Sequence, residues 1–252
     1  MKMKGKVVLV TGGGQGIGYG VARAFAAEGA DLILTGRTLS KLERAKQEIE
    51  SDYGVCVLPV TADGSDEEQA KRAVEEGAAH FGHLDVLVNN AQNSASGVML
   101  VDHTKEDFDK AIYSGLYATF FFMKYAFPYL KESKGSVINF ASGAGLAGRT
   151  GQSSYAAAKE GIRGLSRVAA TEWGPFGINV NVVCPLAMTE GLEAWKEAYP
   201  ALYEQTIHGV PLGHFGDPQQ DIGRVCVFLA SDEASYVTGE TISLQGGSGL
   251  RP

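Results

Sequence analysis

The sequence predicts a single α/β domain over residues 1–252, built on a doubly wound, Rossmann-type parallel sheet of about seven strands with helices on both faces. Three observations predict this fold. Short apolar runs rich in β-branched residues alternate with helix-length segments along the chain, and a glycine-rich turn follows the first run. A length of 252 residues also suits one large α/β domain, because a nucleotide domain with a separate substrate domain needs a longer chain.

Most candidate strands are nearly continuous apolar runs, which is typical of parallel strands buried on both faces. They cover residues 6–11, 31–36, 55–60, 84–90, 135–141, 178–184 and 240–245. Helical patterns fall between them at 17–29, 39–52, 66–80, 104–131, 153–174 and 218–230. This alternation predicts repeated strand–helix units joined by right-handed crossovers.

The segment 186–216 is predicted to be an irregular insertion. Long irregular segments in compact domains usually have a function, so we expect a substrate lid, with ordinary packing as the alternative. It contains apolar and aromatic side chains at Met188, Leu192, Trp195, Tyr199 and Tyr203.

Composition narrows the class of protein. The net charge of −7 argues against a nucleic-acid partner. The N-terminus lacks the apolar core of a signal peptide, and no apolar run approaches membrane-spanning length, so a soluble cytoplasmic protein is expected. Cys56, Cys184 and Cys226 lie in apolar contexts and are predicted to be buried free thiols. No spacing of His and Cys residues suggests a metal site.

The glycine-rich turn, Thr11-Gly12-Gly13-Gly14-Gln15-Gly16-Ile17-Gly18, connects the first strand to the first helix. Glycines allow the backbone to approach a pyrophosphate closely, and free N–H groups at a helix start bind its charge. An ordinary strand–helix turn would not need five glycines. The sequence therefore predicts a dinucleotide site that includes Gly12, Gly14, Gln15, Gly16, Ile17 and Gly18.

The spacing TGxxxGxG, in place of GxGxxG, resembles the short-chain dehydrogenase/reductase family. NAD-preferring members carry an acidic residue at the end of the second strand, where this chain has Gly36 followed by Arg37. A guanidinium pairs with a 2′-phosphate that a carboxylate would repel, which favours NADP(H). Alternatively, Arg37 is a solvated surface charge. Many NADP-preferring relatives also have a basic residue in the glycine loop, where this chain has Gln15.

The resemblance implies further cofactor contacts. A carboxylate after the third strand, the NNA segment that closes the fourth strand and the segment after the sixth strand all have counterparts here. Two departures weaken this match: Gln92 replaces the glycine of NNAG, and Leu186 replaces the glycine of PGxxxT. The positions that carry over are Asp63, Gly64, Asn90, Ala91, Pro185 and Thr189.

The motif Tyr155-Ala156-Ala157-Ala158-Lys159 opens a predicted helix, and its i, i+4 spacing places Tyr155 and Lys159 on one face. A neighbouring ammonium, together with an oxidised nicotinamide, lowers the pKa of a tyrosine, so that Tyr155 can exchange a proton with an alcohol or ketone. Ser142, at the end of the fifth strand, can hydrogen-bond the reacting oxygen. These three residues match the family's catalytic Ser…YxxxK set. A surface Tyr–Lys pair is the alternative for YxxxK alone.

The family usually adds an asparagine from the preceding long helix, which holds a water in the proton relay. The corresponding residue here is Gly115. Glycine within a helix costs roughly 1 kcal/mol relative to alanine, which indicates a packing or functional reason for its presence. The sequence leaves three reasons for Gly115 open: room for an extra water, room for substrate, and close packing between helices.

Across nearly the whole chain, the sequence resembles the bacterial 12α-hydroxysteroid dehydrogenases that act on bile acids, in segments such as NNAQ, IYSGLYATF, INFASGAGL and CPLAMT. The resemblance implies NADP-linked interconversion of a 12α-hydroxyl and a ketone. The alternatives are a reductase of another bulky ketone or of a 3-oxoacyl thioester, and a catalytically silent NADP-sensing protein. The candidate substrate residues are Gln92, Met188, Leu192, Trp195 and Tyr199.

The predicted helix 104–131 carries aromatic residues on much of its surface, including Phe120, Phe121, Phe122, Tyr125 and Phe127. Such a helix is buried on several sides or forms a subunit interface. The family resemblance implies a homotetramer built on this helix and on the helix that begins near Tyr155.

Overall fold

The computed structural model describes residues 1–249, and these residues form one seven-stranded sheet in the order β3-β2-β1-β4-β5-β6-β7. All neighbouring strands are parallel. The predicted fold class is confirmed, and each strand ends within two residues of its predicted limits. The strands are β1 (Val7–Thr11), β2 (Asp31–Gly36), β3 (Val57–Thr61), β4 (Val86–Asn89), β5 (Ser136–Phe140), β6 (Asn179–Pro185) and β7 (Thr241–Leu244).

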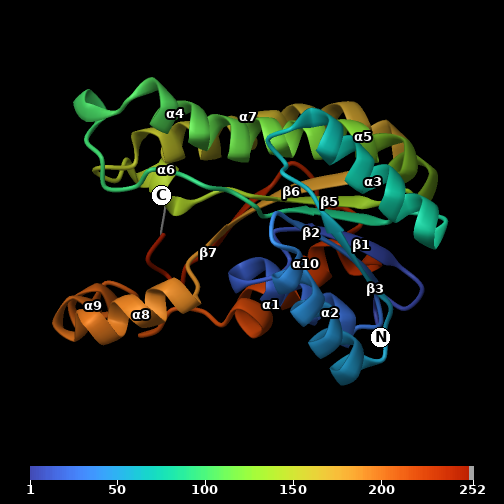
Figure 1. Ribbon diagram of the computed structural model, residues 1–252, viewed down its shortest axis with the longest axis horizontal. Helices are drawn as coiled ribbons and strands as arrows, with labels where there is room; N and C mark the ends of the chain where they lie inside the picture. The colour runs from blue at the N-terminus through green and yellow to red at the C-terminus, as the bar shows by residue number, and fades with distance from the viewer. Residues whose placement is uncertain (250–252) are drawn as a thin grey trace.

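Helices cover both faces of this sheet (Figure 1). One face carries α1 (Gly16–Ala27), α2 (Leu39–Tyr53) and α10 (Arg224–Leu229), and the other carries α3 (Glu67–Phe81), α5 (Ala118–Ser133) and α7 (Ser153–Trp173). Alternate residues of a strand point to opposite faces. Accordingly, Val8 and Val10 of β1 belong to one apolar core, whereas Leu9 belongs to the other.

The strand order determines where a binding crevice can form. The chain proceeds outward from β1 through β2 to β3, then returns to the centre and adds β4 on the other side of β1. At such a switch point, the connections that leave the carboxyl ends of the two central strands diverge and leave a crevice between them. In this chain the crevice lies between the residues that follow Thr11 and those that follow Asn89.

The predicted helix 104–131 is interrupted. It consists of α4 (Lys105–Ala111), a π-helical turn, η2 (Ile112–Tyr117), and α5. A π-turn accommodates one extra residue, and such turns are frequent at functional sites. Likewise, the predicted helix 218–230 begins with a second π-turn, η4 (Pro218–Gly223), before α10.

The prediction of an irregular segment at 186–216 was wrong, because two helices, α8 (Glu190–Ala198) and α9 (Pro200–His208), occupy most of it. The Thr189 hydroxyl caps α8. Pro200 is the first residue of α9, a position whose N–H has no partner within the helix, so the missing N–H of proline costs no hydrogen bond. An isolated bridge between Ala187 and Gly216 ties the two ends of the segment together.

Short elements complete the chain. These are α6 (Gly143–Ala147) and the 3₁₀ turns η1 (Leu100–Asp102), η3 (Gly174–Phe176) and η5 (Asp232–Ala234). None was predicted, since each is too short for a helical pattern to emerge.

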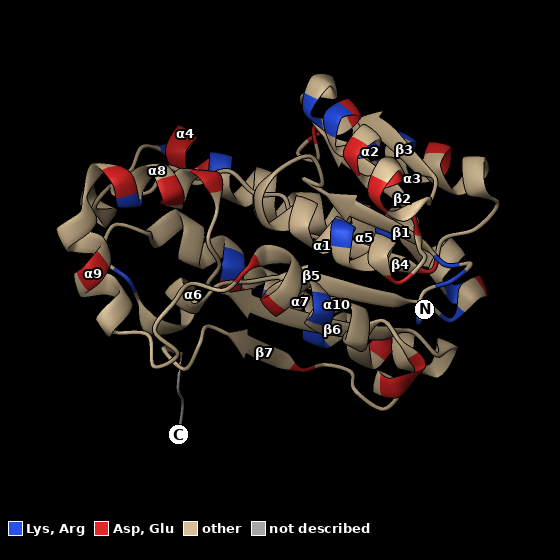
Figure 2. Cartoon of the chain, turned by 90° about the horizontal axis from the view of Figure 1, so that it is seen from below, with Lys and Arg blue, Asp and Glu red and all other residues tan. Residues whose placement is uncertain are grey.

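The three cysteines differ in burial. Cys184 and Cys226 are buried, but the prediction for Cys56 was wrong: it is exposed, because it lies just before β3, the edge strand of the sheet. Within residues 1–249 no helix is long and apolar enough to cross a membrane. Basic and acidic residues are interspersed over the helices rather than gathered by sign (Figure 2).

Candidate active site

The glycine loop lies in the crevice between β1 and β4. Gly12 and Gly16 have φ values of +69° and +56°, in the left-handed region that favours glycine. A Cβ at Gly18 would lie 2.4 Å from the Gly12 carbonyl oxygen, so α1 can pack against the turn only without a side chain there. The loop therefore exposes its backbone to the crevice, as the sequence predicts.

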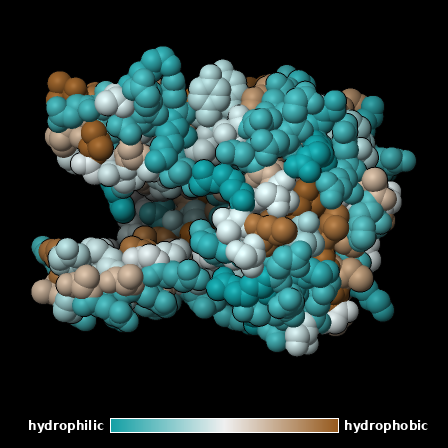
Figure 3. Space-filling model, viewed as in Figure 1, coloured by the Kyte–Doolittle hydropathy of each residue, from teal (hydrophilic) through white to brown (hydrophobic). Residues whose placement is uncertain are grey.

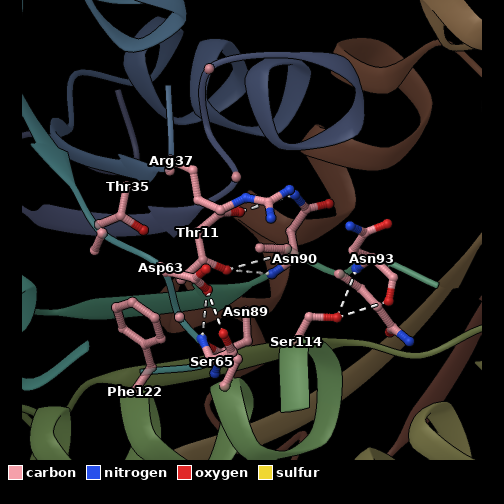
Figure 4. Close-up of a pocket in the computed structure, with 18 of the residues that line it drawn as sticks. Thr11, Thr35, Arg37, Asp63, Ser65, Asn89, Asn90, Asn93, Ser114 and Phe122 are labelled. Atoms are coloured by element: carbon pink, nitrogen blue, oxygen red, sulfur yellow. Dashed lines mark hydrogen bonds between the residues drawn. The ribbon is translucent and has the colours of Figure 1, made fainter. Parts of the chain in front are cut away.

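A hydroxyl joins the ends of the two central strands. The Thr11 Oγ1 accepts hydrogen bonds from the backbone N–H groups of Asn90 (3.0 Å) and Ala91 (3.1 Å). The Asn90 side chain in turn donates to the Thr11 carbonyl at 3.0 Å (Figure 4). This clamp holds the NNA segment beside the glycine loop. Thr11 begins the glycine-rich motif, but the sequence does not predict this clamping role, because the role depends on the pairing of β1 with β4.

A pocket of about 600 Å³ runs along this crevice, within the range of small-molecule sites. The Asp63 carboxylate forms part of its wall and accepts hydrogen bonds from the backbone and hydroxyl of Ser65 (Figure 4). The predicted residues that line it are Gly12, Gly14, Gln15, Ile17, Arg37, Asp63, Gly64, Asn90, Ala91, Gln92 and Thr189. The unpredicted ones include Thr35, Thr38, Lys41, Leu42, Ser65, Asn93, Ser114 and Phe122.

The end of the pocket beyond β2 is basic. Arg37 follows β2, and Lys41 extends from the first turn of α2 to hydrogen-bond the Gln15 side chain on the glycine loop. Lys41 thus places a cation beside the loop, although the loop itself contains none. The exposed backbone, the basic end and the volume of the pocket together suit a nicotinamide dinucleotide.

Ser142, Tyr155 and Lys159 lie together near the carboxyl end of β5, the strand that pairs with β4, and none of the three lines this pocket. Tyr155 is the third residue of α7, and the Lys159 Nζ lies 5.6 Å from the centre of its ring. Ser142, at the N-terminus of α6, hydrogen-bonds Tyr155 and also caps α6 through the Ala144 N–H at 3.1 Å. The three predicted residues are thus brought into one cluster by β5, α6 and α7.

Burial governs the ionisation of this cluster. It raises the pKa of Tyr155, an effect that the hydrogen bond from Ser142 opposes. It also lowers the pKa of Lys159 to about 7, although the Nζ donates to the Phe140 carbonyl at 2.6 Å. Because the protein alone raises the pKa of Tyr155, further positive charge is needed before the phenolate can form near neutral pH.

Lys159 should make the stability of the cofactor-free protein depend on pH. The folded protein releases this proton at about pH 7, whereas the unfolded chain holds it up to the ordinary pKa of 10.5. Between these values the unfolded state binds more protons, so the free energy of unfolding rises with pH. Urea denaturation should therefore show that the free energy of unfolding of the wild type rises from about pH 6 to about pH 9 relative to that of Lys159→Met. A difference that is constant with pH would contradict the lowered pKa.

Of the residues of the segment 186–216, only Thr189 lines this pocket. Trp195 of α8 packs edge-on against Tyr203 of α9, which packs in the same way against Phe215, so these rings hold the two helices together. Tyr199 is 56% exposed. Figure 3 shows a deep hollow between an arm built from α8 and α9 and an opposite arm that carries α4.

Comparison with known proteins agrees with this geometry. Residues 12–248 match the family described as enoyl-(acyl carrier protein) reductase. A 12α-hydroxysteroid dehydrogenase from a Clostridium species is 61% identical over 98% of both chains. The 3-oxoacyl-[acyl-carrier-protein] reductase of Thermotoga maritima is 37% identical over 98% of this chain and 99% of its own. The crystal structure of a putative short-chain alcohol dehydrogenase from Sinorhizobium meliloti has a TM-score of 0.89 and 30% identity, covering 98% of this chain and 97% of its own.

Proposed function

We propose that this chain, an oxidoreductase that belongs to the short-chain dehydrogenase/reductase family, interconverts the 12α-hydroxyl group of bile acids and the corresponding ketone with NADP(H). The observation that carries the reaction is the cluster of Ser142, Tyr155 and Lys159, which gathers near the end of β5, beside the strand whose following residues line the dinucleotide pocket. The proposed substrate rests on the 61% identity with the clostridial enzyme.

The proposed mechanism assigns one task to each residue. Ser142 donates a hydrogen bond to the substrate oxygen, and Tyr155 gives that oxygen a proton in reduction or removes it in oxidation. Lys159 is held by the Phe140 carbonyl, and its remaining N–H groups would bind the nicotinamide ribose. The bound nicotinamide supplies the hydride in reduction, and its positive charge when oxidised lowers the pKa of Tyr155.

The choice of NADP over NAD rests on Arg37 and Lys41, which enter the same end of the pocket from the end of β2 and the start of α2. β2 ends at Gly36, so no carboxylate at the end of this strand repels a 2′-phosphate. Lys41 also supplies the charge next to the glycine loop that Gln15 does not. Both side chains are exposed at the rim, where a phosphate can reach them.

The lid and the facing arm support a bulky apolar substrate. Tyr199 on the lid is 56% exposed, and Val101 on the other arm is 89% exposed, although both are apolar or aromatic. A steroid between the two arms would bury such surface, at roughly 25 cal/mol per Å². We assign the contacts on the lid side to Met188, Leu192, Trp195 and Tyr199.

A panel of ketones tests the substrate. With NADPH, the protein should reduce 12-oxo bile acids with a kcat/KM at least about tenfold above that for 3-oxo and 7-oxo bile acids. An acetoacetyl thioester tests the alternative suggested by the relative from Thermotoga maritima. Preferential reduction of that thioester would replace the bile-acid assignment, and no NADPH oxidation with any ketone would favour a cofactor-sensing protein.

The aromatic residues near η2 support self-association. Tyr113, Tyr117 and Phe120 are exposed, and the first two stack with ring centres 4.9 Å apart. Val168, on the neighbouring helix α7, is also exposed. A homotetramer that pairs these helices between subunits would cover this surface, and sedimentation equilibrium would give its mass.

A further inference from the structure

A histidine joins the arm that carries α4 to the first turn of α7. The His103 Nε2 lies 3.0 Å from the Ser154 Oγ. Its Nδ1 lies 3.3 Å from the Ser153 Oγ and 3.3 Å from the Met99 carbonyl oxygen. Ser154 is fully buried and directly precedes Tyr155 on α7. The ring therefore connects the arm to the residues that lead into the proposed catalytic tyrosine.

The partners of the ring determine which nitrogen carries its proton. A carbonyl oxygen can only accept, so the bond to Met99 requires the proton on Nδ1. In the neutral ring Nε2 is then an acceptor, and the Ser154 hydroxyl donates to it. This is the one hydrogen bond of that buried hydroxyl among residues 1–249. Because a buried hydroxyl without a partner is costly, the bond stabilises the arm in contact with α7.

Backbone contacts hold the same segment at its other end. The Gly97 N–H donates to the Gly151 carbonyl at 2.8 Å, and Val98 forms an isolated parallel bridge with Gln152. A Cβ added to Gly151 would lie 3.1 Å from the Gly97 Cα, so the two backbones are in direct contact. We call residues 97–103 the arm tip. It is attached at both ends to the start of α7 and the residues just before it.

The part of the arm tip between these attachments is apolar and exposed. Met99, Leu100 and Val101 are 52%, 72% and 89% exposed, and none of them lines the dinucleotide pocket. The arm that carries them forms one wall of the hollow in Figure 3, opposite α8 and α9. Tyr199 and Leu202 are exposed on that opposite wall. Exposed apolar surface on both walls suits a bulky apolar ligand that touches both.

We propose that His103 is a positioning residue that holds the arm tip on α7, so that the apolar side chains of the tip form the second wall of the substrate site. The proposal rests on the proposed function. A bulky ketone binds between this wall and the lid with its carbonyl at Tyr155, whereas a small ketone reaches Tyr155 without touching the arm tip. His103 takes no part in proton or hydride transfer, and acts by fixing where the wall lies relative to Tyr155.

A substitution that removes the ring nitrogens tests this role. His103→Leu should raise the KM for a bulky ketone at least about tenfold and leave kcat within about twofold, because it removes binding that is equal in the ground and transition states. Kinetics with the smallest cyclic ketone that the wild type reduces should stay unchanged. His103→Gln should recover most of the loss, since its carboxamide oxygen can accept from the Ser154 hydroxyl. Equal losses for bulky and small ketones, or no loss, would overturn the proposal.

A double-mutant cycle tests whether the contact with Ser154 carries the effect. Ser154→Ala removes the hydroxyl from a buried position and should itself raise the KM for the bulky ketone. Because the two side chains are in direct contact, the rise in the double variant with His103→Leu should be well below the product of the two single rises. A rise equal to the full product would show that His103 acts through other contacts and would overturn the proposal.

Hydrogen–deuterium exchange tests the attachment of the arm tip without turnover. In His103→Leu, the backbone amides of residues 97–103 should exchange faster than in the wild type, because the segment opens more often. NADPH affinity should stay unchanged, which shows that the rest of the fold is intact. His80→Leu is the matched control, since His80 is an exposed histidine on α3, and it should alter neither exchange in the arm tip nor KM.

These tests separate the role of His103 from the proposed substrate. The kinetic measurements use whichever bulky ketone the wild type reduces, so a wrong bile-acid assignment leaves them intact. If the wild type reduces no ketone, the proposed function fails, while the exchange experiment still shows whether His103 holds the arm tip. Wild-type exchange of residues 97–103 in His103→Leu would overturn the proposal even in an active enzyme.

Discussion

Replacing Tyr155 with phenylalanine should abolish turnover while leaving NADPH binding nearly intact. The variant lacks only the hydroxyl that exchanges the proton with substrate, and general acid–base catalysis contributes roughly 10²–10⁴-fold. The phenyl ring keeps its place on α7 beside Lys159. The measurement is single-turnover reduction of ketone, alongside NADPH affinity from fluorescence titration.

Ser142→Ala is the companion variant. It should retain more activity than Tyr155→Phe, because it removes a hydrogen bond to the reacting oxygen and not the proton itself. It should also raise the pKa of Tyr155 further, since the hydrogen bond from Ser142 opposes the effect of burial. A Tyr155→Phe protein with substantial residual turnover would contradict the proposed role of the phenol.

Arg37→Asp should weaken NADP(H) binding far more than NAD(H) binding. The change replaces a cation that can pair with the 2′-phosphate by a carboxylate that repels it, and one charge-assisted bond is worth about 1.5–3 kcal/mol, or roughly tenfold to 100-fold in affinity. Lys41→Ala should act in the same direction with a smaller effect, because Gln15 and Arg37 stay in place. Dissociation constants for both cofactors measure the outcome.

Lys4→Asp provides the matched control for charge, since Lys4 is exposed and the substitution alters the net charge by the same amount. It should leave both affinities unchanged. Equal losses for NADP and NAD in Arg37→Asp would contradict a contact with the 2′-phosphate and would indicate general damage to the pocket.

The strands and main helices could be predicted because each depends on a local pattern. A run such as Val7–Val10 is buried from both faces, and its continuous apolar character shows in the sequence. The π-turn at 112–117 leaves no such pattern, so helix 104–131 was predicted to be continuous. Helices α8 and α9 are nine residues each, shorter than the window of about 11 residues over which a helical period becomes evident in a sequence.

The candidate site likewise contains residues that the sequence predicts and residues that only the structure identifies. Ser142, Tyr155 and Lys159 could be predicted because a motif with fixed spacing carries the chemistry. Lys41 could not, since its approach to Gln15 depends on how α2 packs beside the glycine loop. A Cβ at Gly115 would lie 2.7 Å from the Gln92 Cδ, and this close contact between two positions that are distant in sequence becomes visible only when β4 and η2 are placed side by side.

Transfer of a labelled hydride tests the central claim most directly. The protein is incubated with a 12-oxo bile acid and NADPH that carries deuterium at the transferable position of the nicotinamide. The account predicts a 12α-hydroxy product with deuterium bound to C12, with one NADPH consumed for each product molecule. An unlabelled product, or an unchanged 12-oxo acid alongside intact NADPH, would contradict it.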